Sequence, residues 1–210
     1  MRSFHSFAIV PAAGHSTRMG RPKLLLPWRG QPLIVPTLGA WRASRVEQVV
    51  VVVRPGDEAL AQVVRSCGAV ALVPAAPPLD MKASVQAGLE WLREACRPAP
   101  DDAFLVAPAD MPRLSTAVID RLLATYATLQ RPQIVVPTLQ GRQGHPVLFP
   151  WSLAAEVATL PAGEGLRMLV ERHSPQRVAC DDVVAAGDDP FLDLDTPQDY
   201  ARWLAESGGK

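Results

Sequence analysis

The run of five valines at 49–53 is the feature that most constrains what this chain can fold into. Valine favours extended backbone, and a strand that is apolar on both faces is typical of a parallel sheet covered by helices on each side. Glu47 and Arg54 bracket the run with charge. The run therefore predicts a strand over 47–54 in the middle of a covered parallel sheet.

Short apolar runs alternate with helix-like segments along the rest of the chain, as in βαβ units. Further strands are expected at 7–11, 69–74, 103–107, 133–137, 146–149 and 177–180. Helices are expected at 32–44, 56–67, 81–96, 116–129, 151–159, 164–173 and 197–206. The helix over 81–96 has the clearest apolar stripe, formed by Val85, Leu89, Leu92 and Cys96. The alternation predicts a doubly wound α/β sheet in a single domain, 1–210.

Charge and hydropathy exclude several kinds of partner. Lys and Arg together number 21, as do Asp and Glu, so nothing favours a nucleic acid or an anionic membrane. No apolar run approaches the ~20 residues that span a bilayer, and the run at 7–13 is too short for a signal peptide. The three scattered cysteines predict buried, reduced side chains rather than disulfides or a zinc site. We therefore expect a cytoplasmic protein.

The segment 12–23 (AAGHSTRMGRPK) follows the first predicted strand directly. The small residues Ala12, Ala13 and Gly14 would let backbone N–H groups approach a ligand closely. Its hydroxyls, from Ser16 and Thr17, and its positive charges, from Arg18 and Lys23, suit the phosphates of a triphosphate. The spacing is neither that of a P-loop nor that of a dinucleotide fingerprint. The alternative is an ordinary glycine-rich turn with solvated basic residues.

Carboxylates follow two later segments. Asp110 comes just after the strand at 103–107, at the sheet edge where ligands of α/β folds bind. It could hold a magnesium ion against phosphate oxygens, or cap the turn before Pro112. Asp193 and Asp195, spaced by two, would share one face of a strand, and Thr196 with Pro197 would begin the last helix. This pair could hold a metal or only cap the turn.

A Gly-His-Pro turn precedes the apolar strand at 146–149. It could present the imidazole of His145 at the rim of a pocket. The alternative is a surface histidine or one satisfied within the fold. Trp28 and Trp151 are interpreted as packing residues.

Taken together, these pieces resemble the nucleotidyltransferases of molybdenum-cofactor synthesis, especially the cytidylyltransferase group. The resemblance covers nearly the whole chain. The matching residues are 12–20 (AAGHSTRMG), 22–23 (PK), 25–27 (LLP), Met81, Ser84, 88–89 (GL), 110–112 (DMP), 144–149 (GHPVLF) and 193–197 (DLDTP).

The resemblance implies a three-layer α/β/α, Rossmann-like fold with a mostly parallel sheet, of the nucleotide-diphospho-sugar transferase type, and Mg²⁺-dependent transfer. It also implies roles for individual residues. The nucleotide would be bound by Ala12, Ala13, Gly14, Ser16 and Ser84, and its phosphates by Arg18 and Lys23. Asp110 and Asp195 would bind the metal, and His145 would bind the acceptor. Arg18, Lys23 and Asp110 would carry catalysis. Asp80 stands where the family often has glycine, and we expect Asp80 and Lys82 near the base pocket.

The family branch with two adjacent glycines in the loop uses guanine nucleotides. The Ala-Ala-Gly loop of this chain resembles the cytidylyl branch, so the implied reaction moves CMP from CTP to a phosphorylated acceptor, molybdopterin or molybdenum cofactor, and releases pyrophosphate. A molybdoenzyme or its chaperone is a further candidate partner. Two alternatives stay open. One is transfer to a sugar 1-phosphate or another phosphorylated alcohol, and the other is a non-catalytic module that hands nucleotide or cofactor to a molybdoenzyme.

Overall fold

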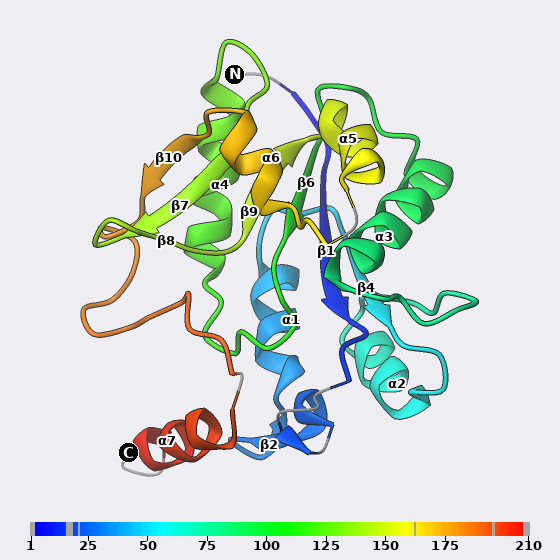
Figure 1. The fold of residues 1–210 in the computed structure, drawn as a ribbon. Helices are drawn as coiled ribbons and strands as arrows, with labels where there is room; N and C mark the ends of the chain where they lie inside the picture. The colour runs from blue at the N-terminus through cyan, green and yellow to red at the C-terminus, as the bar shows by residue number, and fades with distance from the viewer. Residues whose placement is uncertain (1–2, 16–18, 21, 162, 195, 208–210) are drawn as a thin grey trace.

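The computed structural model describes residues 3–15, 19–20, 22–161, 163–194 and 196–207. Within them, eight strands form one sheet in the order β10-β7-β9-β6-β1-β4-β5, with β8 paired to β7 (Figure 1). Its strands are β1 (Ser6–Ala12), β4 (Gln48–Val53), β5 (Val70–Leu72), β6 (Ala103–Val106), β7 (Val135–Leu139), β8 (Arg142–Gln143), β9 (Val147–Pro150) and β10 (Gln176–Ala179). The expected strand over the valine run is confirmed, and Val49–Val53 are at most 1% exposed.

Most neighbouring strands are parallel, as expected. β1 pairs in parallel with β4 and β6, β4 with β5, and β10 with β7. The exceptions are β8, which is antiparallel to β7, and β9, which lies between β6 and β7 and runs antiparallel to both. In that register Val147 pairs with Val106. The residues just before β9 therefore reach the sheet edge at which β6 ends.

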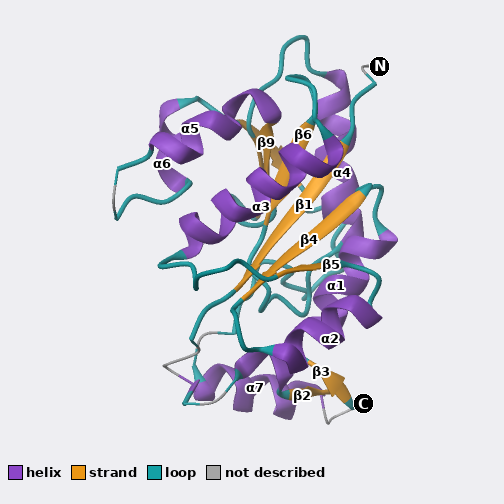
Figure 2. Ribbon diagram, turned by 90° about the vertical axis from the view of Figure 1, so that its right-hand side faces the viewer, coloured by secondary structure: helices purple, strands orange, loops and turns teal. Residues whose placement is uncertain are grey.

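Helices cover both faces of the sheet, which confirms the three-layer arrangement (Figure 2). One layer holds α1 (Ile34–Ala43), α2 (Glu58–Ser66) and α4 (Thr116–Thr128). The other holds α3 (Met81–Cys96), α5 (Ala154–Thr159) and α6 (Arg167–Arg172). No described helix is both long enough and apolar enough to cross a membrane.

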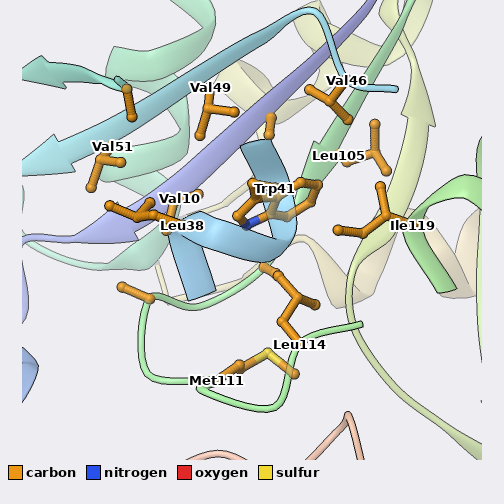
Figure 3. Close-up of a cluster of buried hydrophobic side chains, with 14 of the residues drawn as sticks. Val10, Leu38, Trp41, Val46, Val49, Val51, Leu105, Met111, Leu114 and Ile119 are labelled. Atoms are coloured by element: carbon orange, nitrogen blue, oxygen red, sulfur yellow. The ribbon is translucent and has the colours of Figure 1, made fainter. Parts of the chain in front are cut away.

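Trp41 of α1 lies at the centre of the larger core cluster, surrounded by side chains of β1, β4, β6 and α4 (Figure 3). Val10, Val49 and Leu105 come from the sheet and Ile119 from α4. All five side chains are at most 1% exposed. Burial of this apolar surface is the main force that fixes α1 and α4 on the sheet.

A smaller apolar cluster joins two segments far apart in the chain. Trp28 lies in a two-stranded sheet of β2 (Pro27–Trp28) and β3 (Gln31–Pro32), and Trp203 lies in α7 (Pro197–Ser207). Their ring centroids are 5.0 Å apart, and α7 packs beside β2 (Figure 1). Trp28 and Trp151 are 4% and 9% exposed, which confirms both as packing residues.

Three local expectations are wrong. The segment at 191–194 is irregular, so Asp193 does not lie in a strand. Cys96 is exposed, because the buried stripe of α3 ends at Leu92 and the chain turns away at Arg97, whose φ is 51°. Pro32 belongs to β3, so α1 begins only at Ile34.

Candidate active site

The residues expected to hold a nucleotide gather around a cavity of about 480 Å³, here called the loop cavity. It lies beyond the carboxyl ends of β1 and β6, the edge at which ligands of α/β sheets bind. A Cβ on Gly14 would meet no atom within 4 Å, so the loop backbone borders open space there. The expected residues that line this cavity are Ala12, Ala13, Gly14, Lys23, Ser84 and Asp110.

Lys23 and Asp110 meet at this cavity. Lys23 begins the short helix η2 (Lys23–Leu25). Its Nζ donates to Oδ2 of Asp110, and also to the backbone carbonyl of Leu194 at 2.9 Å. The two charged side chains are only 17% and 9% exposed. The ion pair is therefore largely shielded from water and fixes the positions of both groups.

The second carboxylate oxygen of Asp110, Oδ1, is buried and has no hydrogen-bond partner among the described residues. A buried acceptor left unpaired costs free energy, so this oxygen suits a cation or a ligand donor. Asp110 thus points its carboxylate at Lys23 and the cavity. In the described part of the chain it does not cap the turn before Pro112, which was the alternative role.

Two polar residues at the start of α3 line the loop cavity as well. The carboxylate of Asp80 accepts from the backbone N–H of Ala83 at 2.7 Å and so caps α3. Oγ of Ser84 donates to the carbonyl of Asp80 at 3.2 Å, and Ser84 is only 3% exposed. Asp80 thus lies on the wall of the loop cavity, and its place near the base pocket stays a prediction.

The placement expected for Lys82 is wrong. Its Nζ donates to the backbone carbonyls of Leu160 and Pro161, at 3.1 and 2.7 Å. These carbonyls follow the end of α5, whose free acceptors attract a cation. Lys82 lines none of the cavities described here, because its ammonium faces α5 rather than the loop cavity.

His145 precedes β9 and lies at the edge where β6 ends. Burial lowers the pKa of His145, while the carbonyl of Val106 and the carboxylates of Asp193 and Asp110 act in the opposite direction. Its Nδ1 is buried without a hydrogen-bond partner in the described part of the chain. Burial therefore favours the neutral imidazole, which lies within electrostatic reach of Asp110.

His145 lines a second cavity of about 1030 Å³, here called the β9 cavity. Its floor is apolar and includes Val106, Val147 and Phe149 of the sheet. Its rim is polar, with Gln143, Ser174, Arg167, Glu171 and Arg177. Met81 lines both this cavity and the loop cavity, so the two adjoin at the start of α3.

A third cavity, of about 330 Å³, contains a cation that the sequence analysis did not single out. Arg54 follows β4, and its Nη1 contacts Nδ1 of His15 at 2.6 Å. We call this the Arg54 cavity. Its position is a signal that could have found it, because Arg54, like Asp110, is a charged residue that follows a buried strand.

Three expected site residues, Ser16, Arg18 and Asp195, lie outside the described residues. Asp193 is described and exposed, in the irregular segment before α7.

The N-cap expected at Thr196 is confirmed. Thr196 and Asp199 form a capping box, in which Oγ1 of Thr196 accepts from the N–H of Asp199 at 3.2 Å and Oδ2 of Asp199 accepts from the N–H of Thr196 at 2.9 Å.

A model of the MobA-like NTP transferase domain matches residues 8–178. The chain belongs to this family. The resemblance seen in the sequence is thereby confirmed at the level of the family, and the chain is a nucleotidyltransferase of the MobA type. Lys23, Asp110 and His145 all fall inside the match, whereas Leu194 lies beyond it.

Curated relatives of this MobA-like chain include the molybdenum cofactor guanylyltransferase of Xanthomonas euvesicatoria pv. vesicatoria, which is 28% identical over 95% of this chain and 94% of that protein. The nicotine blue oxidoreductase of Paenarthrobacter nicotinovorans is 27% identical, over 93% of this chain and 95% of that protein. A 2-C-methyl-D-erythritol 4-phosphate cytidylyltransferase of the same Xanthomonas strain is 41% identical, over only 56% of this chain and 44% of that protein.

The fold of the MobA-like chain is similar to that of solved structures. Rv0371c from Mycobacterium tuberculosis H37Rv has a TM-score of 0.72 at 25% identity, covering 98% of this chain and 100% of that one. A structure of Rv0371c in complex with manganese has a TM-score of 0.68 at 25% identity, covering 97% and 99%.

Proposed function

We propose that this MobA-like chain transfers CMP from CTP to a phosphorylated acceptor of the molybdopterin class and releases pyrophosphate. The observation that carries the proposal is the buried pair of Lys23 and Asp110 on the wall of the loop cavity, next to a second and larger cavity. The loop cavity would hold the nucleotide, and the β9 cavity would hold the acceptor.

The chemistry of such a transfer needs no covalent intermediate with the protein. It needs two anionic substrates held in line and the charge of the transition state neutralised. The ammonium of Lys23 would contact the phosphates near the reacting phosphorus. Arg18, also expected on the phosphates, would add a second positive charge. Such electrostatic contacts are each worth about 10²–10³ in rate.

A divalent cation would neutralise further negative charge on the triphosphate. The carboxylate of Asp110 is suited to bind such a cation. Oδ1 is a buried carboxylate oxygen without a hydrogen-bond partner in the described residues. No group of three potential protein ligands occurs among the described residues. Mg²⁺ commonly binds one or two carboxylates and takes its other ligands from phosphates and water. Asp110, with Asp195 as the proposed second ligand, would hold this ion against the triphosphate.

The preference for CTP over GTP rests on the loop wall. Ala13 lines the loop cavity and is 6% exposed, and its methyl group narrows the wall where a glycine would leave room. A narrower wall favours the single ring of cytosine over the double ring of guanine. Asp80 and Ser84 add polar groups at the same wall.

The size of the β9 cavity supports a bulky acceptor. At about 1030 Å³ it has roughly twice the volume of the loop cavity. The apolar floor would take a ring system, the guanidinium groups of Arg167 and Arg177 on the rim would attract a phosphate, and His145 would contact the acceptor near the start of β9.

One observation favours a second candidate, transfer to a smaller phosphorylated alcohol. The chain is 41% identical to the methylerythritol phosphate cytidylyltransferase over 122 residues, but it spans only 44% of that relative. The large volume of the β9 cavity argues against so small an acceptor. A third candidate, a non-catalytic module that hands nucleotide or cofactor to a molybdoenzyme, would bind nucleotide without turnover.

The test is pyrophosphate release in the presence of Mg²⁺. CTP and GTP are each combined with molybdopterin, with a sugar 1-phosphate and with methylerythritol 4-phosphate. The expected result is release with CTP and molybdopterin, reduced by about 10²–10³ in Asp110→Asn and Lys23→Met. Asp182→Asn, which removes an exposed carboxylate paired with Arg121, is the matched control and should keep full activity. Nucleotide binding without release for any pair would overturn the proposal and favour the non-catalytic module.

A further inference from the structure

The Arg54 cavity adjoins the loop cavity but has no role in the reaction described above. The two cavities share part of the segment that follows β1. The shared lining residues are Ala12, Gly14, His15, Lys23 and Leu24. The Arg54 cavity and the β9 cavity share no lining residue. The loop cavity therefore borders both of the other cavities and lies between them.

Arg54 places a guanidinium in this third cavity. Its contact is with Nδ1 of His15, and among the described residues no carboxylate pairs with it. A guanidinium can only donate hydrogen bonds, so Nδ1 of His15 must be the acceptor and carry no proton. Asp57, the acid that lines the cavity, accepts from the backbone N–H of Leu60 at 3.2 Å and caps α2. This half-buried positive charge beside the proposed phosphate-binding loop therefore has no anionic partner in the described part of the chain.

We propose that the Arg54 cavity binds the leaving pyrophosphate, which is the β- and γ-phosphate portion of the bound triphosphate, and that Arg54 is a ligand of it. This inference rests on the proposed function. Lys23 lines both the loop cavity and the Arg54 cavity. The bond that breaks therefore lies beside Lys23, with the nucleoside monophosphate portion in the loop cavity and the pyrophosphate portion beyond it.

The reaction balances without any further reactant. A phosphate oxygen of the acceptor donates an electron pair and forms a bond to the α-phosphorus. The bond between the α-phosphorus and the bridging oxygen breaks, and its electron pair stays on that oxygen, which leaves as part of pyrophosphate. Negative charge grows on the leaving group, where the planar fork of Arg54 can accept it through paired hydrogen bonds.

His15 acts here as a positioning residue. Its neutral Nδ1 holds Nη1 of Arg54 at 2.6 Å and leaves the other donors of the guanidinium for phosphate oxygens. A purely structural alternative is that Arg54 only supports the loop through His15. The two roles predict different effects of removing the Arg54 side chain. Loss of a loop support would weaken binding of every part of the nucleotide, whereas loss of a pyrophosphate ligand would weaken binding of pyrophosphate alone.

The test measures binding of inorganic pyrophosphate and of CMP separately, by calorimetry with Mg²⁺ present. The variants are Arg54→Ala and Arg54→Lys, the latter keeping the charge but not the fork. Arg45→Ala is the matched control, because Arg45 precedes β4 at the opposite edge of the sheet and pairs with Asp120. Arg54→Ala should weaken pyrophosphate binding about 10–100-fold, the range of a charged hydrogen bond, and leave CMP binding unchanged. Arg54→Lys should lie between Arg54→Ala and the wild type, and Arg45→Ala should match the wild type.

Three results would overturn the inference. They are absence of pyrophosphate binding to the wild type, unchanged binding in Arg54→Ala, and equal weakening of pyrophosphate and CMP in that variant. The melting temperature of each variant shows whether a loss reflects unfolding, in which case Arg54→Lys decides. Because pyrophosphate binding needs no acceptor, this result is independent of the turnover assay, whose failure with every acceptor would refute the proposed function instead.

Discussion

Nζ of Lys23 donates both to the carboxylate of Asp110 and, at 2.9 Å, to the backbone carbonyl of Leu194. One ammonium thus joins the loop after β1, the loop after β6 and the segment before α7. Asp110 and Leu194 are also joined directly, because the N–H of Leu194 donates to the carbonyl of Asp110 at 3.2 Å. The arrangement holds a positive charge at the edge of the sheet before any substrate binds.

Removing one member of this buried pair should destabilise the fold. In Lys23→Met the carboxylate of Asp110 stays buried without a cation, which typically costs about 3–5 kcal/mol of unfolding free energy. Arg121→Met is the control, since Arg121 and Asp182 form an exposed pair worth about 0–1 kcal/mol. Urea denaturation measures both. Equal small losses in the two variants would show that the Lys23 pair is not held in a buried geometry.

Two glycines should respond oppositely to the same change. A Cβ on Gly88 of α3 would come within 2.7 Å of Cγ2 of Ile9, so Gly88→Ala should cost about 1–3 kcal/mol of stability. A Cβ on Gly14 would meet nothing within 4 Å, so Gly14→Ala should fold with unchanged stability. It should nevertheless lower kcat/KM for CTP about 10–100-fold, because the methyl group enters the loop cavity. Full activity of Gly14→Ala would place the nucleotide elsewhere.

Lys82 should not influence the choice of base. Its ammonium binds carbonyls that follow α5, so Lys82→Met should cost about 0.5–1.5 kcal/mol of stability per lost hydrogen bond and leave the ratio of kcat/KM for CTP and GTP unchanged. Ala13→Gly is the comparison variant. It should shift that ratio toward GTP, because loss of the methyl group widens the loop cavity. A shift in Lys82→Met of the same size would contradict the structure.

The free energy of unfolding should decrease as the pH falls, because His145 is buried. Burial lowers the pKa of His145 below its ordinary 6.5, so on acidification the unfolded chain takes up this proton before the folded chain does. Between the lowered pKa and about 6.5, unfolding free energy therefore rises with pH. His145→Gln should flatten that slope in denaturation curves recorded from pH 5 to 7.5.

His5 provides a control of opposite sign. Its hydrogen bond and charge interaction with Glu47 raise the pKa of His5, so its contribution to stability is fully present below about 6.5 and is lost as pH rises through the raised value. His5→Gln should therefore change the pH slope in the direction opposite to His145→Gln. Identical effects of the two substitutions would show that burial does not dominate at His145.

Much of the fold was predictable because its signals are local. The valine run, the alternation of strands and helices, and the position of Asp110 after a buried strand each depend on a few adjacent residues. The proximity of His145 to the end of β6 was not predictable from local pattern. It arises because β9 enters the sheet antiparallel between β6 and β7, and strand pairing depends on residues distant in sequence.

The directions of individual side chains also could not be predicted from the sequence. Asp80 and Lys82 are two positions apart at the start of a helix, where successive side chains point in different directions. Asp80 therefore caps α3 on the loop cavity while Lys82 extends toward α5. The alternation of apolar and acidic residues predicts a strand at 191–194, but Leu194 is buried against the cluster of Trp28 and Trp203 rather than in a sheet.

The contact between Lys23 and Leu194 has a consequence for biosynthesis. The two residues are separated by 171 positions, and Leu194 is made only after the last strand of the sheet, β10, which ends at Ala179. The strands from β1 to β10 are all made by Ala179, yet Lys23 lacks its backbone acceptor until the segment before α7 has followed. We therefore expect a nascent chain that ends between Ala179 and Leu194 to contain every strand of the sheet while Lys23 still lacks this carbonyl acceptor.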